Sequence, residues 1–205
     1  MADSSLIEQL KSLRWDVVQR VHGNAHHTLI SLCVAWWISF GISLGKNYDA
    51  FEEFSDGGGG ERGEGRGQCD AILCEGSVPI GMLEVEGILQ RNPKRYYETM
   101  NKVARFLKSN MGDFEKLQFA LVFLYPTGFA DARPVITPER LAHAVQISKE
   151  APGKKLLLVE IEKTYAQYPV GSIRARYSGT PRAARGMLIE NGTVGTPVNY
   201  FRVGV

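Results

Sequence analysis

Residues 68–90 read QCDAILCEGSVPIGMLEVEGILQ, and this stretch decides the fold that we expect for the chain. Two seven-residue segments, 68–74 and 80–86, are rich in apolar side chains and are typical of strands. Gly76 and Pro79 mark a turn, so the stretch predicts an antiparallel hairpin with a five-residue loop over 75–79. Because apolar residues occupy successive positions, we expect both faces of these strands to be covered.

Three carboxylates interrupt the two apolar strands. If the hairpin closes symmetrically about Ser77, Asp70 lies opposite Glu84. In the same register Gln68 lies opposite Glu86. Strand side chains alternate, so the two glutamates share a face, and like charges that face each other across a ladder destabilise a sheet. A bound cation would remove this repulsion, and we therefore predict a metal site of Asp70, Glu84 and Glu86, with Gln68 just outside it.

The residue types at this site favour one class of cation. Carboxylate oxygens suit Mg²⁺ or Mn²⁺, and no His or Cys stands where a zinc site would need it. We expect Cys69 and Cys74, which flank Asp70, to be small buried residues without a metal role. A solvated edge hairpin would tolerate an acidic row without metal, but the apolar neighbours predict carboxylates that are at least partly desolvated and costly unless paired.

Helices and strands alternate along the rest of the chain. The expected helices cover residues 5–21, a second segment that ends at about residue 44, residues 93–110 and residues 137–150. Besides the hairpin, the expected strands cover 48–54, 117–125 and 155–162, and a β-rich tail begins at residue 171. Asn92-Pro93 and Thr137-Pro138 each combine an N-cap residue with proline, which is a typical helix beginning. This order predicts an α/β fold in which helices flank a mixed sheet.

The length of 205 residues fits one domain. We divide it into N-terminal helices (1–45), a motif-bearing core (46–125), a helix and strand that extend the core (126–170) and a basic β-rich tail (171–205). The three cysteines match no zinc motif and no signal-peptide pattern opens the chain, so we expect a reducing, cytoplasmic setting. The uncharged run over 28–44 is diluted by polar residues and predicts a buried helix, with no membrane partner.

The hairpin, helix and following strand resemble the core of the PD-(D/E)xK, or restriction endonuclease-like, nucleases. In that superfamily a strand with Asp precedes a hairpin partner with Glu-x-Lys, then a helix and another strand. The resemblance covers residues 48–125 and implies a restriction endonuclease-like core that hydrolyses phosphodiester bonds of DNA, in repair or restriction. Family members often add an upstream acidic residue, for which Glu52 and Glu53 are candidates. Glu52 is preferred because it shares its strand face with Tyr48 and Phe54.

One residue departs from the family pattern, because Glu86 stands where lysine is usual. A few restriction enzymes resemble this sequence in that respect. The resemblance then implies that Asp70 and Glu84 hold the ion while Glu86 accepts a proton or binds a second ion. Lys94 on the next helix is a candidate for a migrated cation. The alternatives are an inactive nuclease-like domain that binds nucleic acid or a protein partner, and a structural protein that keeps only the fold.

The charge distribution favours a polyanionic partner. Residues 1–90 carry a net charge of −7 and residues 91–205 carry +9. The residues expected to contact phosphate are Lys94, Arg95, Lys102, Arg105, Arg174 and Arg176. DNA is the predicted partner, RNA stays open, and so does a homodimer for cutting two strands. His22, His26 and His27 lack the glutamate of an HExxH site, so we expect them to make polar contacts near a helix end.

Overall fold

The structure is a computed structural model, and it describes residues 5–20, 26–55, 68–89, 94–109, 112–127, 134–165 and 179–203. The helices are α1 (Ser5–Gln9), η1 (Leu10–Ser12), α2 (Trp15–Val18), α3 (His26–Ser43), α4 (Lys94–Leu107), η2 (Gly112–Lys116) and α5 (Pro138–Glu150). The strands are β1 (Tyr48–Ser55), β2 (Gln68–Glu75), β3 (Val78–Leu89), β4 (Phe119–Thr127), β5 (Lys155–Tyr165), β6 (Gly179–Glu190), β7 (Thr193–Val194) and β8 (Val198–Arg202).

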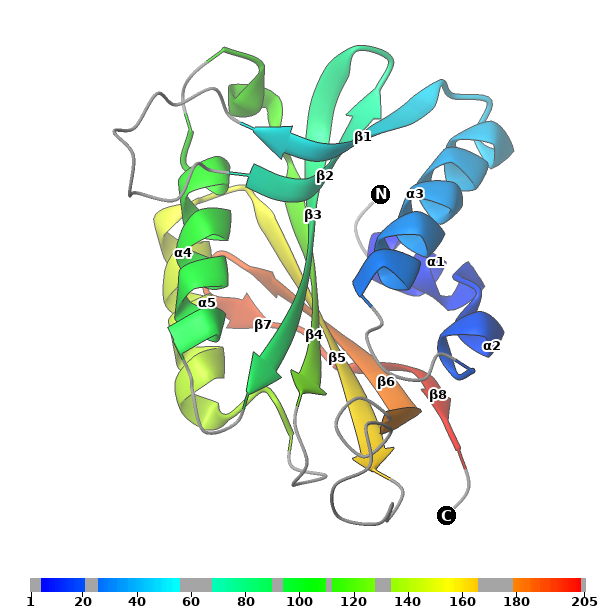
Figure 1. Cartoon of the computed structure of the whole chain (residues 1–205). Coiled ribbons are helices and arrows are strands. Elements are labelled where there is room, and N and C mark those ends of the chain that lie inside the picture. Colours follow the sequence, from blue (N-terminus) through cyan, green and yellow to red (C-terminus); the bar gives the residue numbers. More distant parts are fainter. Residues whose placement is uncertain are drawn as a thin grey trace.

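The strands of this described part form one mixed sheet. Their order is β1-β2-β3-β4-β5-β6-β7, and β8 pairs with β6 beside this path. Neighbours β3, β4 and β5 are parallel, whereas the other pairs are antiparallel. Helices α4 and α5 lie on one face of the sheet, and α1, α2 and α3 lie on the other (Figure 1). The predicted α/β class, with a mixed sheet flanked by helices, is confirmed.

Two hydrophobic cores hold these layers together, one on each face of the sheet. Alternation along β4 sends Leu121 and Phe123 into the core on the α3 side, and Val122 and Leu124 into the core on the α4 and α5 side. All four side chains are fully buried. The successive apolar residues of the central strands thus have the covering on both faces that the sequence predicted.

The hairpin has the predicted register but a different turn. Ala71 pairs with Leu83 and Leu73 with Gly81, which is the symmetry about Ser77 that the sequence indicated. The five-residue loop is wrong, because Glu75 already pairs with Val78 and only two residues form the turn. Gly76, at a φ of 61°, supplies the left-handed conformation that such a tight turn requires. A register shift between Leu73 and Cys74 accommodates the shorter connection.

The predicted helix over 5–21 is broken into α1, η1 and α2. Leu13 takes an extended backbone conformation, with φ −59° and ψ 144°, and this ends the helical run. This break at Leu13 allows Trp15 to be buried, and the indole N–H of Trp15 donates to the carbonyl of Leu10 at 2.7 Å. Tertiary burial of an aromatic ring therefore overrides the apolar spacing, which predicted one continuous helix.

The later helices begin and end close to the predicted positions. The Thr137 hydroxyl accepts a hydrogen bond from the N–H of Arg140 at 3.3 Å, which confirms the N-cap of α5. The residues Asn92 and Pro93 lie outside the described ranges, and α4 is described from Lys94. Across the described segments we find no helix that combines the length and the apolar character needed to span a bilayer.

Trp37 attaches α3 to the hairpin end of the sheet. Its ring is buried, stacks on Tyr48 with centroids 4.2 Å apart, and lies 5.7 Å from the ring of Phe119. Its indole N–H donates to the carbonyl of Cys74 at 3.1 Å. One side chain thus ties α3 to β1, β2 and β4.

We expect Trp37→Ala to lower the free energy of unfolding by about 3–5 kcal/mol, because it leaves a cavity between α3 and the sheet. Ile42→Ala on the same helix is the matched control, since this side chain is 73% exposed. The control should change stability by less than about 0.5 kcal/mol. Urea unfolding measures both, and equal losses in the two variants would contradict this account of α3.

Candidate functional site

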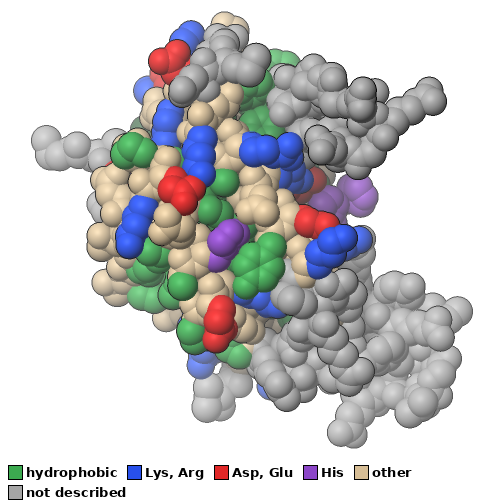
Figure 2. Space-filling model, turned by 90° about the vertical axis from the view of Figure 1, so that its left-hand side faces the viewer, with side chains coloured by type: hydrophobic (Ala, Val, Ile, Leu, Met, Phe, Trp, Pro, Cys, Tyr) green, Lys and Arg blue, Asp and Glu red, His purple; other side chains and the backbone are tan. Residues whose placement is uncertain are grey.

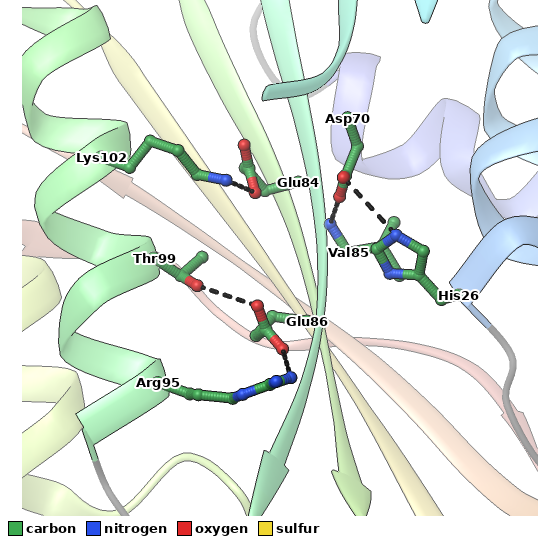
Figure 3. Close-up of polar contacts among 8 residues, drawn as sticks. All are labelled: His26, Asp70, Glu84, Val85, Glu86, Arg95, Thr99 and Lys102. Carbon is green, nitrogen blue, oxygen red and sulfur yellow. Dashed lines mark hydrogen bonds and ion pairs between the residues drawn. The ribbon is translucent and has the colours of Figure 1, made fainter. Parts of the chain in front are cut away.

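Alternation along β3 directs two glutamates toward α4. Leu83 and Val85 belong to the core on the α3 side. Glu84 and Glu86 follow them alternately along the strand and therefore point to the opposite face. Figure 3 shows both carboxylates extending toward α4. Apolar residues thereby fix the direction of the polar ones.

Glu84 is a deeply buried carboxylate with one satisfied oxygen. The residue is 2% exposed, and its Oε2 lies 2.6 Å from Nζ of Lys102. Its Oε1 is buried and has no hydrogen-bond partner among the described residues. Burial raises the pKa of Glu84 to about 8. The Lys102 ammonium opposes this rise in the pKa, whereas the charges of Asp70 and Glu86 add to it.

Glu86 is less buried, and both of its oxygens have partners on α4. Oε1 accepts a hydrogen bond from Arg95 at 3.1 Å, and Oε2 accepts one from the Thr99 hydroxyl at 3.3 Å. Arg95, Thr99 and Lys102 are four and three residues apart in sequence, which places them on one face of a helix. Two acids on β3 therefore face a polar stripe on α4 (Figure 3).

Asp70 is held on the other side of β3. Its Oδ2 accepts a hydrogen bond from the backbone N–H of Val85 at 2.7 Å, and its Oδ1 lies 3.5 Å from Nε2 of His26 at the start of α3. The recorded pairing of β2 with β3 reaches only Ala71, so the Asp70 side chain occupies a β3 donor just beyond the end of the ladder. The expectation that His26 makes polar contacts agrees with this geometry.

The predicted convergence of three carboxylates is not found. Asp70 contacts α3 and the edge of β3, whereas Glu84 and Glu86 contact α4 (Figure 3). Within the described ranges no three His, Cys, Asp or Glu side chains form a group that could hold a metal ion. The reason is that Asp70 turns to satisfy the Val85 N–H instead of facing Glu84 across the ladder.

The remaining candidates for the site are two acids of β1, Glu52 and Glu53, and the amide Gln68 of β2. Glu52 is exposed and pairs with Ala71, whose side chain lies in the core on the α3 side, so Glu52 is on the opposite face from Glu84. Glu53 and Gln68 belong to β1 and β2, but their side chains lie outside what the structure describes.

The predicted basic contacts on α4 are largely paired with acids. Lys94 pairs with Glu98 on its own helix at 3.3 Å, whereas Arg95 and Lys102 pair with the acids of β3. Arg105 is exposed. Figure 2 shows that Lys and Arg side chains lie beside Asp and Glu side chains on the face covered by α4 and α5. The predicted contacts Arg174 and Arg176 lie outside the described residues.

Lys102 is the lysine that contacts Glu84, two turns further along α4 than the expected Lys94. The Lys94 side chain is 76% exposed and pairs with Glu98. The signal that could have found Lys102 is the spacing of Arg95, Thr99 and Lys102, which matches the alternation of Glu84 and Glu86.

Comparison of the chain with protein-family models, curated proteins and solved structures found no match.

A second buried glutamate shows what a satisfied carboxylate looks like in this fold. Glu160 on β5 is fully buried, and its Oε1 accepts a hydrogen bond from the Ile136 N–H at 2.9 Å. Its Oε2 accepts from Nε of Arg185 at 2.8 Å and lies 2.7 Å from Nη2 of that residue. Both oxygens of Glu160 have protein partners, whereas among the described residues only one oxygen of Glu84 has a partner.

We expect the metal-free protein to lose stability relative to Glu84→Gln as the pH rises from about 5 to about 8. The folded protein retains the Glu84 proton up to its pKa of about 8, whereas the unfolded chain loses it near the ordinary value of 4.5. The folded state binds more protons in this window, so stability falls with rising pH. In urea unfolding with a chelator present, the difference in unfolding free energy between the two proteins should change by roughly a few kcal/mol across this pH range. Parallel pH profiles for the two proteins would contradict it.

Proposed function

We propose that this chain is a divalent-metal-dependent endonuclease that hydrolyses phosphodiester bonds of DNA, with Asp70 and Glu84 as its metal-binding carboxylates. The observation that carries the proposal is the buried Oε1 of Glu84, which has no partner among the described residues. A buried acceptor without a partner costs free energy, and a cation would supply the missing interaction.

The order of elements supports the resemblance to the PD-(D/E)xK superfamily. Helix α3 precedes the antiparallel strands β1, β2 and β3, and α4 connects β3 to its parallel neighbour β4. Asp70 lies near the beginning of β2, and Glu84 lies in the second half of β3. These are the places in the hairpin that the family motif requires, so we propose a restriction endonuclease-like core.

The chemistry of the donors fits Mg²⁺ or Mn²⁺. Asp70 and Glu84 offer carboxylate oxygens, which these hard cations prefer over nitrogen or sulfur. The charges of Asp70 and Glu86 raise the pKa of Glu84 and the Lys102 ammonium lowers it, so a divalent ion would act in the same direction as the lysine and favour the charged carboxylate. Bound there, such an ion would polarise a phosphate and acidify a water molecule.

The protein residues would hold and orient the reacting groups. The Val85 N–H and His26 hold the Asp70 carboxylate on the other side of β3, so Asp70 would have to turn toward Glu84 to share an ion with it. Glu86 has partners for both oxygens, and we therefore assign it to holding Arg95 near the site instead of binding a second ion. Arg95 would contact a phosphate of the substrate, together with the exposed Arg105.

We expect the purified protein to nick or cut plasmid DNA with Mn²⁺ or Mg²⁺, and Asp70→Asn and Glu84→Gln each to lower the cleavage rate by about 100-fold or more, because each removes charge that holds the ion. Glu75→Gln is the matched control at the other end of β2, where Glu75 pairs with Lys46 at 3.0 Å. Gel assays under single-turnover conditions measure all three.

The outcomes separate the competing hypotheses. Metal-dependent cleavage that survives in both site variants would refute the assignment of Asp70 and Glu84. DNA binding by the wild type without cleavage, in the presence of either metal, would favour the inactive nuclease-like domain. Neither binding nor cleavage of DNA or RNA would leave a structural role as the better account.

A further inference from the structure

The outer face of α3 carries no charge, although it is exposed. A surface helix normally has a charged or strongly polar outer face, and a helix without one is normally buried. No Asp, Glu, Lys or Arg occurs between His26 and Ser43, yet Ser31, Ala35 and Ser39 are exposed. Figure 1 shows α3 as an outer layer, on the side of the sheet opposite α4 and α5. This face therefore lacks the charged side chains that favour contact with water.

Other exposed parts of the described structure are protected by charge. The exposed positions of α4 include Lys94, Glu98 and Arg105. The edge strand β1 has Asp49 and Glu52 at exposed positions, and such charges oppose pairing with another strand. The uncharged face of α3 is thus a distinct feature of this molecule.

The side chains on this face are symmetric about Ala35. Ser31 and Ser39 stand four residues before and after it, and Leu32 and Ile38 stand three residues before and after it. The two serines and Ala35 are exposed, whereas Leu32 and Ile38 are half-buried, so the burial follows the same symmetry. Spacings of three and four residues place all five side chains on one face of the helix. We call these five residues the α3 stripe.

A symmetric stripe can complement itself, which is what a two-fold contact between identical chains requires. If two copies of α3 pack antiparallel with Ala35 at the axis, Ser31 faces Ser39 of the second copy, and Leu32 faces Ile38. Small side chains at the centre allow the two helices to approach closely. The half-buried Leu32 and Ile38 would lose their remaining contact with water, and no charged group would be desolvated.

The same composition disfavours partners of other chemistry. Nucleic acid is bound through Lys and Arg, and a helix that lies on a membrane combines a basic face with large apolar side chains. The exposed positions of the α3 stripe are Ser and Ala instead. A protein surface without charge fits these positions, and a second α3 stripe is such a surface.

We propose that the α3 stripe is the interface of a homodimer, in which a second copy of this chain packs antiparallel on α3. One pair of helices buries less area than the ~1,600 Å² of a standard interface, so the dimer is weak and its dissociation constant lies in the micromolar range. The proposal is independent of the proposed nuclease activity.

Sedimentation velocity of the full chain between about 1 and 200 µM measures the dimer. Ala35→Arg places two like charges at the axis, and we expect it to weaken dimerisation at least about 10-fold. Ala142→Arg is the matched control, because Ala142 is an exposed alanine of α5 on the other side of the sheet, and it should dimerise like the wild type. Circular dichroism melting identifies variants that do not fold.

Two double variants test the antiparallel register, and they decide the result if Ala35→Arg does not fold. Ser31→Glu combined with Ser39→Lys brings opposite charges together across the axis, whereas Ser31→Lys combined with Ser39→Lys brings like charges together. We expect the first double variant to dimerise at least about 10-fold more tightly than the second, and added salt to narrow this difference.

Three outcomes would overturn the inference. A wild type that stays monomeric over this concentration range would leave the α3 stripe to a different partner. Equal dimerisation of the Ala35→Arg and Ala142→Arg proteins would place the interface elsewhere, and equal dimerisation of the two double variants would refute the antiparallel register. None of these outcomes bears on the proposed nuclease function, which is tested separately at Asp70 and Glu84.

Discussion

A carboxylate buried in a central strand has to be neutralised, and much of the described site follows from this constraint. Glu84 projects from β3 between an apolar sheet and α4, where water does not reach it. Lys102 must therefore lie at its level on α4, and the same helix face then brings Thr99 and Arg95 to Glu86. The hydrophobic side of α4, with Tyr96, sets the rotation of the helix that makes these contacts.

The position of β3 in the sheet provides the second requirement of the site. It is antiparallel to β2 on one side and parallel to β4 on the other, and it extends beyond the pairing recorded with β2. Beyond the last recorded pair, the Val85 N–H is bonded by the side chain of Asp70 instead of by a strand carbonyl. The end of a ladder is thus where a carboxylate can be held by the backbone without disturbing the rest of the sheet.

The sequence predicted what depends on local periodicity. The hairpin register, the mixed sheet and the later helices follow from alternation, apolar spacing and helix caps, and the structure has them. Sequence patterns did not predict the features that depend on tertiary contacts. The burial of Trp15 breaks the first helix, the turn at Gly76 shortens the hairpin loop, and Asp70 bonds Val85 instead of facing Glu84. The choice of Lys102 over Lys94 depends on how α4 sits on the sheet, which spacing alone does not determine.

The contrast between Glu84 and Glu160 separates a structural acid from a candidate functional one. Each is buried on the face that α4 and α5 cover, but Glu160 has donors for both oxygens and links the segment before α5 to β6. Glu84 has one oxygen without a partner in the described residues and a carboxyl pKa raised by burial. Well-packed apolar residues in place of both Glu84 and Lys102 would serve the fold as well or better, because the two charges of the pair must be desolvated. A local rule that is broken in a well-packed sheet is expected at a functional site, where stability is given up for chemistry.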